Sequence, residues 1–169
     1  LTPPESGELH CIDLHSGEVA WTRPRSDALF IAGVDQDTIV IASSDTLRAV
    51  HLADGTPAWS DNTIPLPTGA LPSGHGYVSD GRLFLPLTSG AVIGIDMSAG
   101  VMESLLETSH SEPLGNLICY RGSVLSQSPT MLDKFEQLDV LGERAEAALA
   151  ANPNDSTAIR ELAEMKRVD

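Results

Sequence analysis

A hairpin-like pattern of residues occurs three times in the first hundred or so residues of the chain. Its first copy, from Glu8 to Trp21, reads as a short strand, a turn at Ser16-Gly17 and a second strand. Each copy places three marker residues four positions apart, in the sets Asp13-Gly17-Trp21, His51-Gly55-Trp59 and Asp96-Gly100-Ser104. Successive copies lie roughly 40 residues apart, so the chain must fold as a series of similar supersecondary units.

Turn residues divide each full unit into four short strands. In the second unit we expect strands at 28–32, 38–42, 47–52 and 56–60, and in the third at 77–79, 82–87, 91–97 and 101–106. A fourth unit opens with strands at 116–120 and 123–127 and then stops. A period near 40 residues with four strands per unit is typical of a β-propeller blade, which stacks on its neighbours to bury both faces of its sheet.

The pattern changes after residue 130, where apolar residues recur at helical spacing. The first set comprises Leu138, Leu141, Ala145, Ala148 and Leu149, and the second comprises Ala158, Leu162 and Met165. Asn152-Pro153 ends the first helix, and Asn154 or Asp155 can cap the second. We therefore predict a mainly β chain: a partial propeller of about three four-stranded blades in residues 1–129, followed by a helical hairpin in residues 130–169.

Charge and composition narrow the classes of partner. The chain carries a formal net charge of −14 with only 10 Lys plus Arg, whereas nucleic acids and anionic membranes require a basic surface. No apolar run approaches the roughly 18–20 residues of a spanning helix, so we expect no membrane insertion. The chain begins Leu-Thr-Pro-Pro without an initiator Met, which favours a piece of a longer protein.

Several residues are of types that could bind a metal ion or catalyse a reaction. His10, Cys11, Asp13 and His15 lie close enough in sequence for a metal site to be conceivable, but Asp13 is better explained as a turn residue. The segment 72–76 is rich in Gly and lacks the Lys-Ser/Thr ending of a phosphate-binding loop. His51, His75 and His110 are far apart, and no Ser stands in a nucleophile elbow. Cys11 and Cys119 are too distant in sequence to indicate a disulfide framework or a metal pair. We therefore expect no catalytic residue, no cofactor-binding residue and no metal ligand.

The strings from Cys11 to Trp21 and from Val50 to Trp59 resemble the tryptophan-docking repeat of the quinoprotein family, in the pattern apolar-x-Asp-x-x-x-Gly-x-x-x-Trp. The resemblance covers about residues 8–127. It implies that each Trp packs against a neighbouring blade and that Asp and Gly shape the turn. The structural residues it implies are Asp13, Gly17, Trp21, Gly55, Trp59, Asp96 and Gly100.

Members of that family are either dehydrogenases that bind pyrroloquinoline quinone or non-enzymatic propellers that resemble them. The enzymes are similar to one another in an adjacent Cys-Cys pair, a Trp platform, and Asp, Asn and Glu residues around calcium. This chain has no Cys-Cys pair, and its two Trp residues stand at docking positions. We therefore expect no cofactor.

The tail from Ala147 to Asp155, followed by Ala158, Leu162 and Ala163, resembles the junction between tetratricopeptide units. A C-terminal helical hairpin that covers a propeller surface is an equal alternative.

Together, these patterns favour a fragment of a larger bacterial exported protein, periplasmic or in the cell envelope, that binds protein or peptide without catalysis. The alternative is part of a quinone- and calcium-dependent alcohol or sugar dehydrogenase whose catalytic blades lie elsewhere. An incomplete propeller would also expose a blade face and strand edges, which favours association between copies of the chain.

Overall fold

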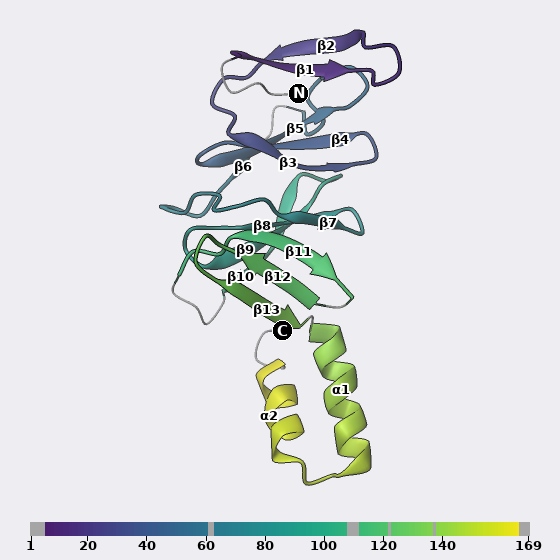
Figure 1. Ribbon diagram of the computed structural model, residues 1–169, viewed down its shortest axis with the longest axis vertical. Helices are drawn as coiled ribbons and strands as arrows, with labels where there is room; N and C mark the ends of the chain where they lie inside the picture. Colours follow the sequence, from purple (N-terminus) through teal and green to yellow (C-terminus); the bar gives the residue numbers. More distant parts are fainter. Residues whose placement is uncertain (1–5, 61–62, 108–111, 122, 137, 166–169) are drawn as a thin grey trace.

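The computed structural model describes residues 6–60, 63–107, 112–121, 123–136 and 138–165. Four antiparallel sheets follow one another along the long axis of the molecule, and a helical hairpin projects beyond the last sheet (Figure 1). We call the sheets the first to the fourth blade, in chain order.

The first two blades hold two and four described strands. The first pairs β1 (Glu8–Ile12) with β2 (Val19–Pro24). The second has the order β3-β4-β5-β6, with bounds Phe30–Asp35, Thr38–Ala42, Thr46–His51 and Ile64–Pro65.

Four strands are described in the third blade and three in the fourth. The third has the order β10-β9-β8-β7, and its strands in chain order are β7 (Tyr77–Ser79), β8 (Arg82–Pro86), β9 (Ala91–Asp96) and β10 (Val101–Glu107). The fourth comprises β11 (Asn116–Tyr120), β12 (Ser123–Gln127) and β13 (Leu132–Glu136). These sheets confirm the predicted mainly β fold and partial propeller.

Two strands differ from the sequence expectation. The segment 56–60 makes only an isolated bridge between Val50 and Pro57, and the fourth strand of the second blade is the later and shorter β6. Pro57 has no N–H for a ladder, which explains the break. The second difference is β13, which pairs with β12 inside the segment expected to be helical, so that the first helix begins at Leu138.

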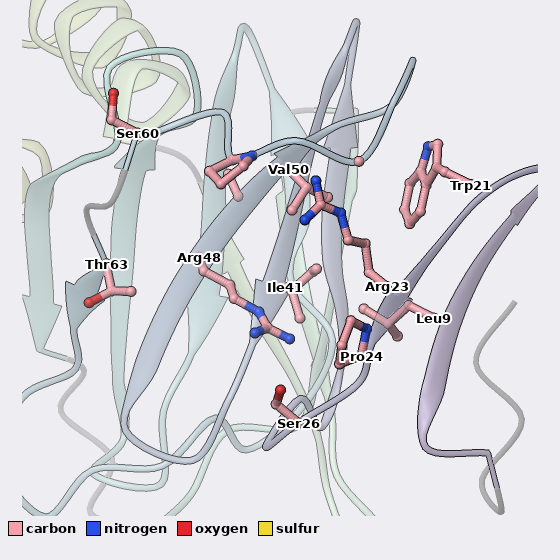
Figure 2. Close-up of a pocket in the computed structure, with 13 residues that line it drawn as sticks. Leu9, Trp21, Arg23, Pro24, Ser26, Ile41, Arg48, Val50, Ser60 and Thr63 are labelled. Atoms are coloured by element: carbon pink, nitrogen blue, oxygen red, sulfur yellow. The ribbon is translucent and has the colours of Figure 1, made fainter.

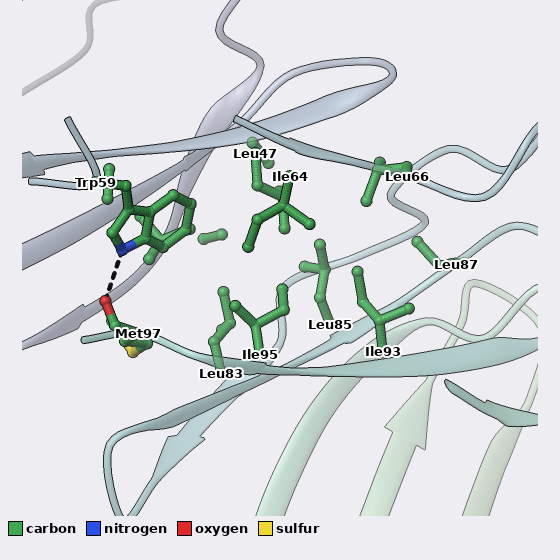
Figure 3. Close-up of a cluster of buried hydrophobic side chains, with 14 of the residues drawn as sticks. Leu47, Trp59, Ile64, Leu66, Leu83, Leu85, Leu87, Ile93, Ile95 and Met97 are labelled. Carbon is green, nitrogen blue, oxygen red and sulfur yellow. Dashed lines mark hydrogen bonds between the residues drawn. The ribbon is translucent and has the colours of Figure 1, made fainter. Parts of the chain in front are cut away.

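The main hydrophobic core lies between the second and third blades. Alternate residues of β8 and β9 point to one face, which buries Leu83, Leu85, Ile93 and Ile95 completely. Figure 3 shows these side chains meeting Leu47 and others from the second blade. The alternation therefore holds two sheets face to face.

A smaller core joins the first blade to the second and includes Leu9, Ile39 and Ile41. Strand β4 consequently has both faces buried, with Ile39 and Ile41 on one side and Val40 and Ala42 in the main core on the other. This explains why its sequence, Thr-Ile-Val-Ile-Ala, is almost continuously apolar.

The helices α1 (Leu138–Ala151) and α2 (Ser156–Met165) pack on each other. Asp155 caps α2, because its Oδ1 accepts hydrogen bonds from the backbone N of Thr157 at 2.9 Å and of Ala158 at 3.1 Å. Ala145 and Ala158 are buried, so small side chains occupy sheltered positions in both helices. Neither helix is long and apolar enough to cross a membrane, as judged over the described residues.

Candidate functional site

The three marker turns share one backbone geometry. The backbone N of Gly17 donates to Asp13 O at 2.8 Å, and the backbone N of Gly100 donates to Asp96 O at 2.9 Å. Both glycines have positive φ, 76° and 68°, which L side chains rarely adopt. The carboxylates close the turns: Asp13 Oδ1 accepts from the backbone N of Ser16, at 2.8 Å, and Asp96 Oδ1 from that of Ala99, at 2.8 Å.

The second copy reaches the same turn with different side chains. The backbone N of Gly55 donates to His51 O at 2.8 Å, as in the other copies. The carboxylate comes from Asp54, whose Oδ1 accepts from the hydroxyl and the backbone N of Thr56 at 2.6 and 2.8 Å. The His51 ring instead bonds Asp37 Oδ2 at 2.8 Å. A His at the marker position is therefore compatible with the turn.

These hydrogen bonds lower the pKa of all three turn carboxyls. The backbone N of Ser16 and then of His15 lower the pKa of Asp13, and the hydroxyl of Thr56 lowers the pKa of Asp54. The backbone N of Ala99, followed by the Ser98 hydroxyl, lowers the pKa of Asp96. Their charged form is stabilised because it accepts several hydrogen bonds.

The two Trp side chains each reach the marker turn of the next blade. Trp59 is buried, its Nε1 donates to Met97 O at 2.7 Å, and its ring covers Gly100 so closely that an added Cβ would lie 2.6 Å from Trp59 Cγ. Figure 3 shows the hydrogen bond from Trp59 to Met97 at the end of the main core.

Trp21 repeats this arrangement one blade earlier. Its Nε1 donates to Leu52 O at 2.8 Å, and a Cβ on Gly55 would lie 2.8 Å from Trp21 Cδ2. Leu52 and Met97 each stand three residues before the covered glycine, so the two contacts are geometrically equivalent. Glycine is needed twice over at Gly55 and Gly100, for positive φ and for the close approach of the indole.

The third copy has Ser104 in place of a docking Trp, and the fourth blade has no marker glycine to receive one. Ser104 pairs with Gly94 within its own blade. In the fourth blade, Ser123 pairs with Glu136 as Arg82 pairs with Asp96 in the third blade. Gly100 stands four residues after Asp96, so its equivalent in the fourth blade is Val140, four residues after Glu136, in α1. The Trp and its receiving glycine are thus replaced together.

The structure does not bring the residues considered for a metal site together around one point. Cys11 Sγ lies 3.9 Å from Leu52 O, the His10 ring bonds Thr22 Oγ1 at 3.1 Å, and Asp13 serves the turn. No group of three or more His, Cys, Asp or Glu residues suited to a metal ion occurs in the described part of the chain. His110 lies outside the described residues.

The Gly-rich segment 72–76 joins the third blade to the fourth. The backbone N of Ser73 donates to Pro86 O at 3.0 Å, and that of His75 donates to Asn116 Oδ1 at 2.8 Å. The backbone N of Leu117 in turn donates to His75 O at 2.8 Å. The segment has a structural role, and a Cβ at Gly74 or Gly76 would collide with backbone of the fourth or third blade.

Two cavities open between blades. The first, of about 280 Å³, lies between the first and second blades and is lined by Trp21, Arg23 and Arg48 among others (Figure 2). The second, of about 580 Å³, lies between the second and third blades and is lined by four aspartates together with His51 and Arg82, the aspartates being Asp35, Asp37, Asp80 and Asp96.

The sequence pattern did not single out Arg23 or Arg48. The available signal was strand parity: Arg23 stands two residues after the docking residue Trp21 in β2 and therefore shares its face. The cavity itself depends on the break at Pro57, which the pattern did not reveal.

Comparison with known proteins agrees with the repeat architecture. The family described as outer membrane protein assembly factor BamB matches residues 2–158, which is nearly the whole chain. A search of curated proteins gave no significant match.

Solved structures share the fold at low sequence identity. The computationally designed Ika4 protein is 12% identical with a TM-score of 0.58, and the match covers 78% of this chain and 80% of that one. BamB from Moraxella catarrhalis is 22% identical with a TM-score of 0.52, over 79% of this chain and 40% of that one. A protein of unknown function from Bacteroides caccae is 15% identical with a TM-score of 0.52, over 79% and 55%.

The chain thus spans less than half the length of the Moraxella BamB structure that it matches. The match across residues 2–158, together with the stacked blades and their docked Trp residues, shows that the chain belongs to the BamB-like family of quinoprotein-type repeat proteins.

Proposed function

We propose that this chain is part of a non-catalytic, protein-binding scaffold in the bacterial cell envelope. The observation that carries the proposal is an exposed apolar face at the end of the stack of blades. This face lies on the fourth blade, opposite the side that carries the buried Leu117.

The residues of this face follow from the register of the fourth blade. Ile118, Tyr120 and Leu132 share it and are 51%, 60% and 68% exposed. The Arg121 guanidinium lies 5.1 Å from the centroid of the Tyr120 ring, which places a cation beside the apolar side chains. An aromatic residue, an Arg and aliphatic neighbours are the composition favoured where proteins bind proteins.

The site chemistry also supports binding over catalysis. The three carboxyls with lowered pKa values, Asp13, Asp54 and Asp96, all serve marker turns. Turn hydrogen bonds therefore account for these lowered pKa values, including that of Asp96, which also lines the cavity between the second and third blades. The two cysteines stand on the first and fourth blades, far from the adjacent pair found in the quinone enzymes.

The family adds support for the compartment and the class of partner. Its description, outer membrane protein assembly factor, implies an envelope protein that works on other proteins. In the same scaffold we propose that α1 and α2 begin a tetratricopeptide-like array, because the buried Ala145 and Ala158 resemble the small residues that let such helices approach closely.

Site-specific photo-crosslinking in the full-length protein tests this proposal. A photo-reactive amino acid at position 120 is expected to give a discrete crosslinked protein band in intact cells. The matched control is position 14, where Leu14 is 95% exposed on the first marker turn and outside the proposed face. Equal labelling from positions 120 and 14, or none from 120, would contradict a binding role for this face.

A further inference from the structure

We propose that the cavity between the first and second blades is a binding site for a peptide carboxylate that is flanked by an apolar side chain. The inference rests on the proposed protein-binding function and adds the chemistry of one contact. It concerns a different surface from the exposed face of the fourth blade.

Charge distinguishes this cavity from the rest of the chain. The protein has 24 Asp plus Glu and only 10 Lys plus Arg. The described residues that line the cavity nevertheless include Arg23 and Arg48 and no Asp or Glu. The cavity between the second and third blades, by contrast, has four aspartates.

The two arginines enter the cavity from opposite walls. Figure 2 shows Arg23 extending from β2 toward the second blade and Arg48 extending from β5 toward the first. Neither side chain has a salt bridge with a described residue. The charge of Arg23 contributes weakly to lowering the pKa of Asp54, but Asp54 Oδ1 already accepts hydrogen bonds from Thr56. Two positive charges on the walls of one cavity favour the binding of an anion there.

The Arg48 guanidinium is fixed in position, but one of its hydrogen-bond donors has no partner. Its Nη2 donates to Arg25 O at 3.0 Å, which fixes the guanidinium against the loop after β2. Its Nε is buried without any hydrogen-bond partner. A buried donor without a partner costs free energy, and the Arg48 side chain that carries it lines the cavity, where a carboxylate would accept charge-assisted hydrogen bonds from the guanidinium.

The remaining walls fit an apolar group next to the anion. Trp21, Pro24 and Pro57 line the cavity and offer flat apolar surfaces, and Ser26, Ser60 and Thr63 add hydroxyls. Arginine and an aromatic surface side by side suit a carboxylate whose neighbouring side chain is apolar. A free phosphate would use the arginines and the hydroxyls but not the apolar walls.

The test titrates the 169-residue chain with N-acetylphenylalanine and follows backbone amide shifts by NMR. We expect saturable shifts confined to β2, β5 and the loop around Pro57. N-acetylphenylalanine amide, which lacks the negative charge, should bind at least about tenfold more weakly. Inorganic phosphate should also bind more weakly, because it leaves the apolar walls unused.

Charge variants assign the effect to the cavity. Arg23→Gln removes a guanidinium that makes no hydrogen bond to the described residues, so folding should be retained while binding falls roughly tenfold. Arg48→Gln should do the same, but it also removes the bond to Arg25 O. Arg160→Gln is the matched control, because it removes an equal charge from an exposed position in α2, away from the cavity, and should leave binding unchanged.

The outcomes separate this site from the proposed function. Equal binding of the acid and the amide, an unchanged affinity in Arg23→Gln, or tighter binding of phosphate would overturn the carboxylate site. Such results would leave crosslinking from position 120 unaffected, and a failed crosslink would leave the NMR titration unaffected.

Discussion

At the scale of residues, two glycines and two tryptophans determine how the blades stack. Each indole lies on the glycine of the next marker turn and donates to a carbonyl three residues before it. Gly17 has the same turn and a similar φ, but nothing lies within 4 Å of an added Cβ. Gly17 is therefore required only for the positive φ of its turn, whereas Gly55 and Gly100 are also required for the close approach of an indole.

We predict that Gly100→Ala destabilises the chain by about 2–4 kcal/mol, because it combines positive-φ strain with overpacking against Trp59. Gly17→Ala, the control, should cost only about 1 kcal/mol, since it meets strain alone. Urea unfolding measures both. Equal losses would show that the indole can move aside without cost.

Replacement of the indoles should give unequal losses. Trp59→Ala should cost about 3–5 kcal/mol, because it leaves a cavity in the main core and removes the bond to Met97 O. Trp21→Ala should cost clearly less, because Trp21 is only half-buried. A larger loss at Trp21 in the same urea experiment would contradict this order.

The turn carboxyls predict how stability changes with acid. The folded pKa values of Asp13 and Asp96 lie below the ordinary value of 3.8, so their stabilising contribution is present above that pH and is lost as pH falls through the folded pKa. Asp96→Asn should therefore flatten the fall in stability below about pH 4. Thermal unfolding between pH 2 and 6 measures this, and parallel curves for variant and parent would refute it.

At the scale of elements, the sequence predicted strands best where an apolar pattern corresponded directly to the burial of one or both faces of the strand. Alternating apolar residues predicted β8 and β9, and the doubly buried β4 had an almost continuous apolar run. The pattern failed at β13, where, over the positions 132–135 whose burial is described, Leu132 is exposed and Asp133 and Phe135 are partly buried. That strand forms because β12 offers it an edge, and this is a tertiary effect.

The candidate site could be predicted only in part for a related reason. The marker residues lie within single hairpins, so their spacing is visible in one stretch of sequence. Arg23 and Arg48 come from different blades, and the gap between them depends on where β6 begins. Spacing within one strand carries no information about such a cavity.

Helix α2 offers a separate test, because its first turn depends on one side chain. Asp155→Ala should reduce the stability of the helical hairpin by about 1 kcal/mol. Asn154→Ala is the control, since its side chain makes no hydrogen bond in the described structure. Hydrogen exchange of the α2 amides reports the difference, and equal exchange in the two variants would argue against the cap.

At the scale of the whole molecule, the fourth blade carries an exposed apolar face at the end of the described stack. We predict that the isolated chain self-associates at micromolar concentration by burying Ile118, Tyr120 and Leu132. Ile118→Lys should shift the population toward monomer in light scattering. Leu14→Lys, which changes an apolar residue outside that face, should not. A strict monomer in the parent chain would rule out this association.

The central claim is that the quinoprotein-type repeats serve here as a scaffold and not as an enzyme. The most direct measurement adds pyrroloquinoline quinone and Ca²⁺ to the full-length protein and follows dye-linked oxidation of alcohols and sugars. The scaffold account predicts no turnover above a control without protein. Saturable, quinone-dependent turnover would contradict it and would place this chain within a dehydrogenase.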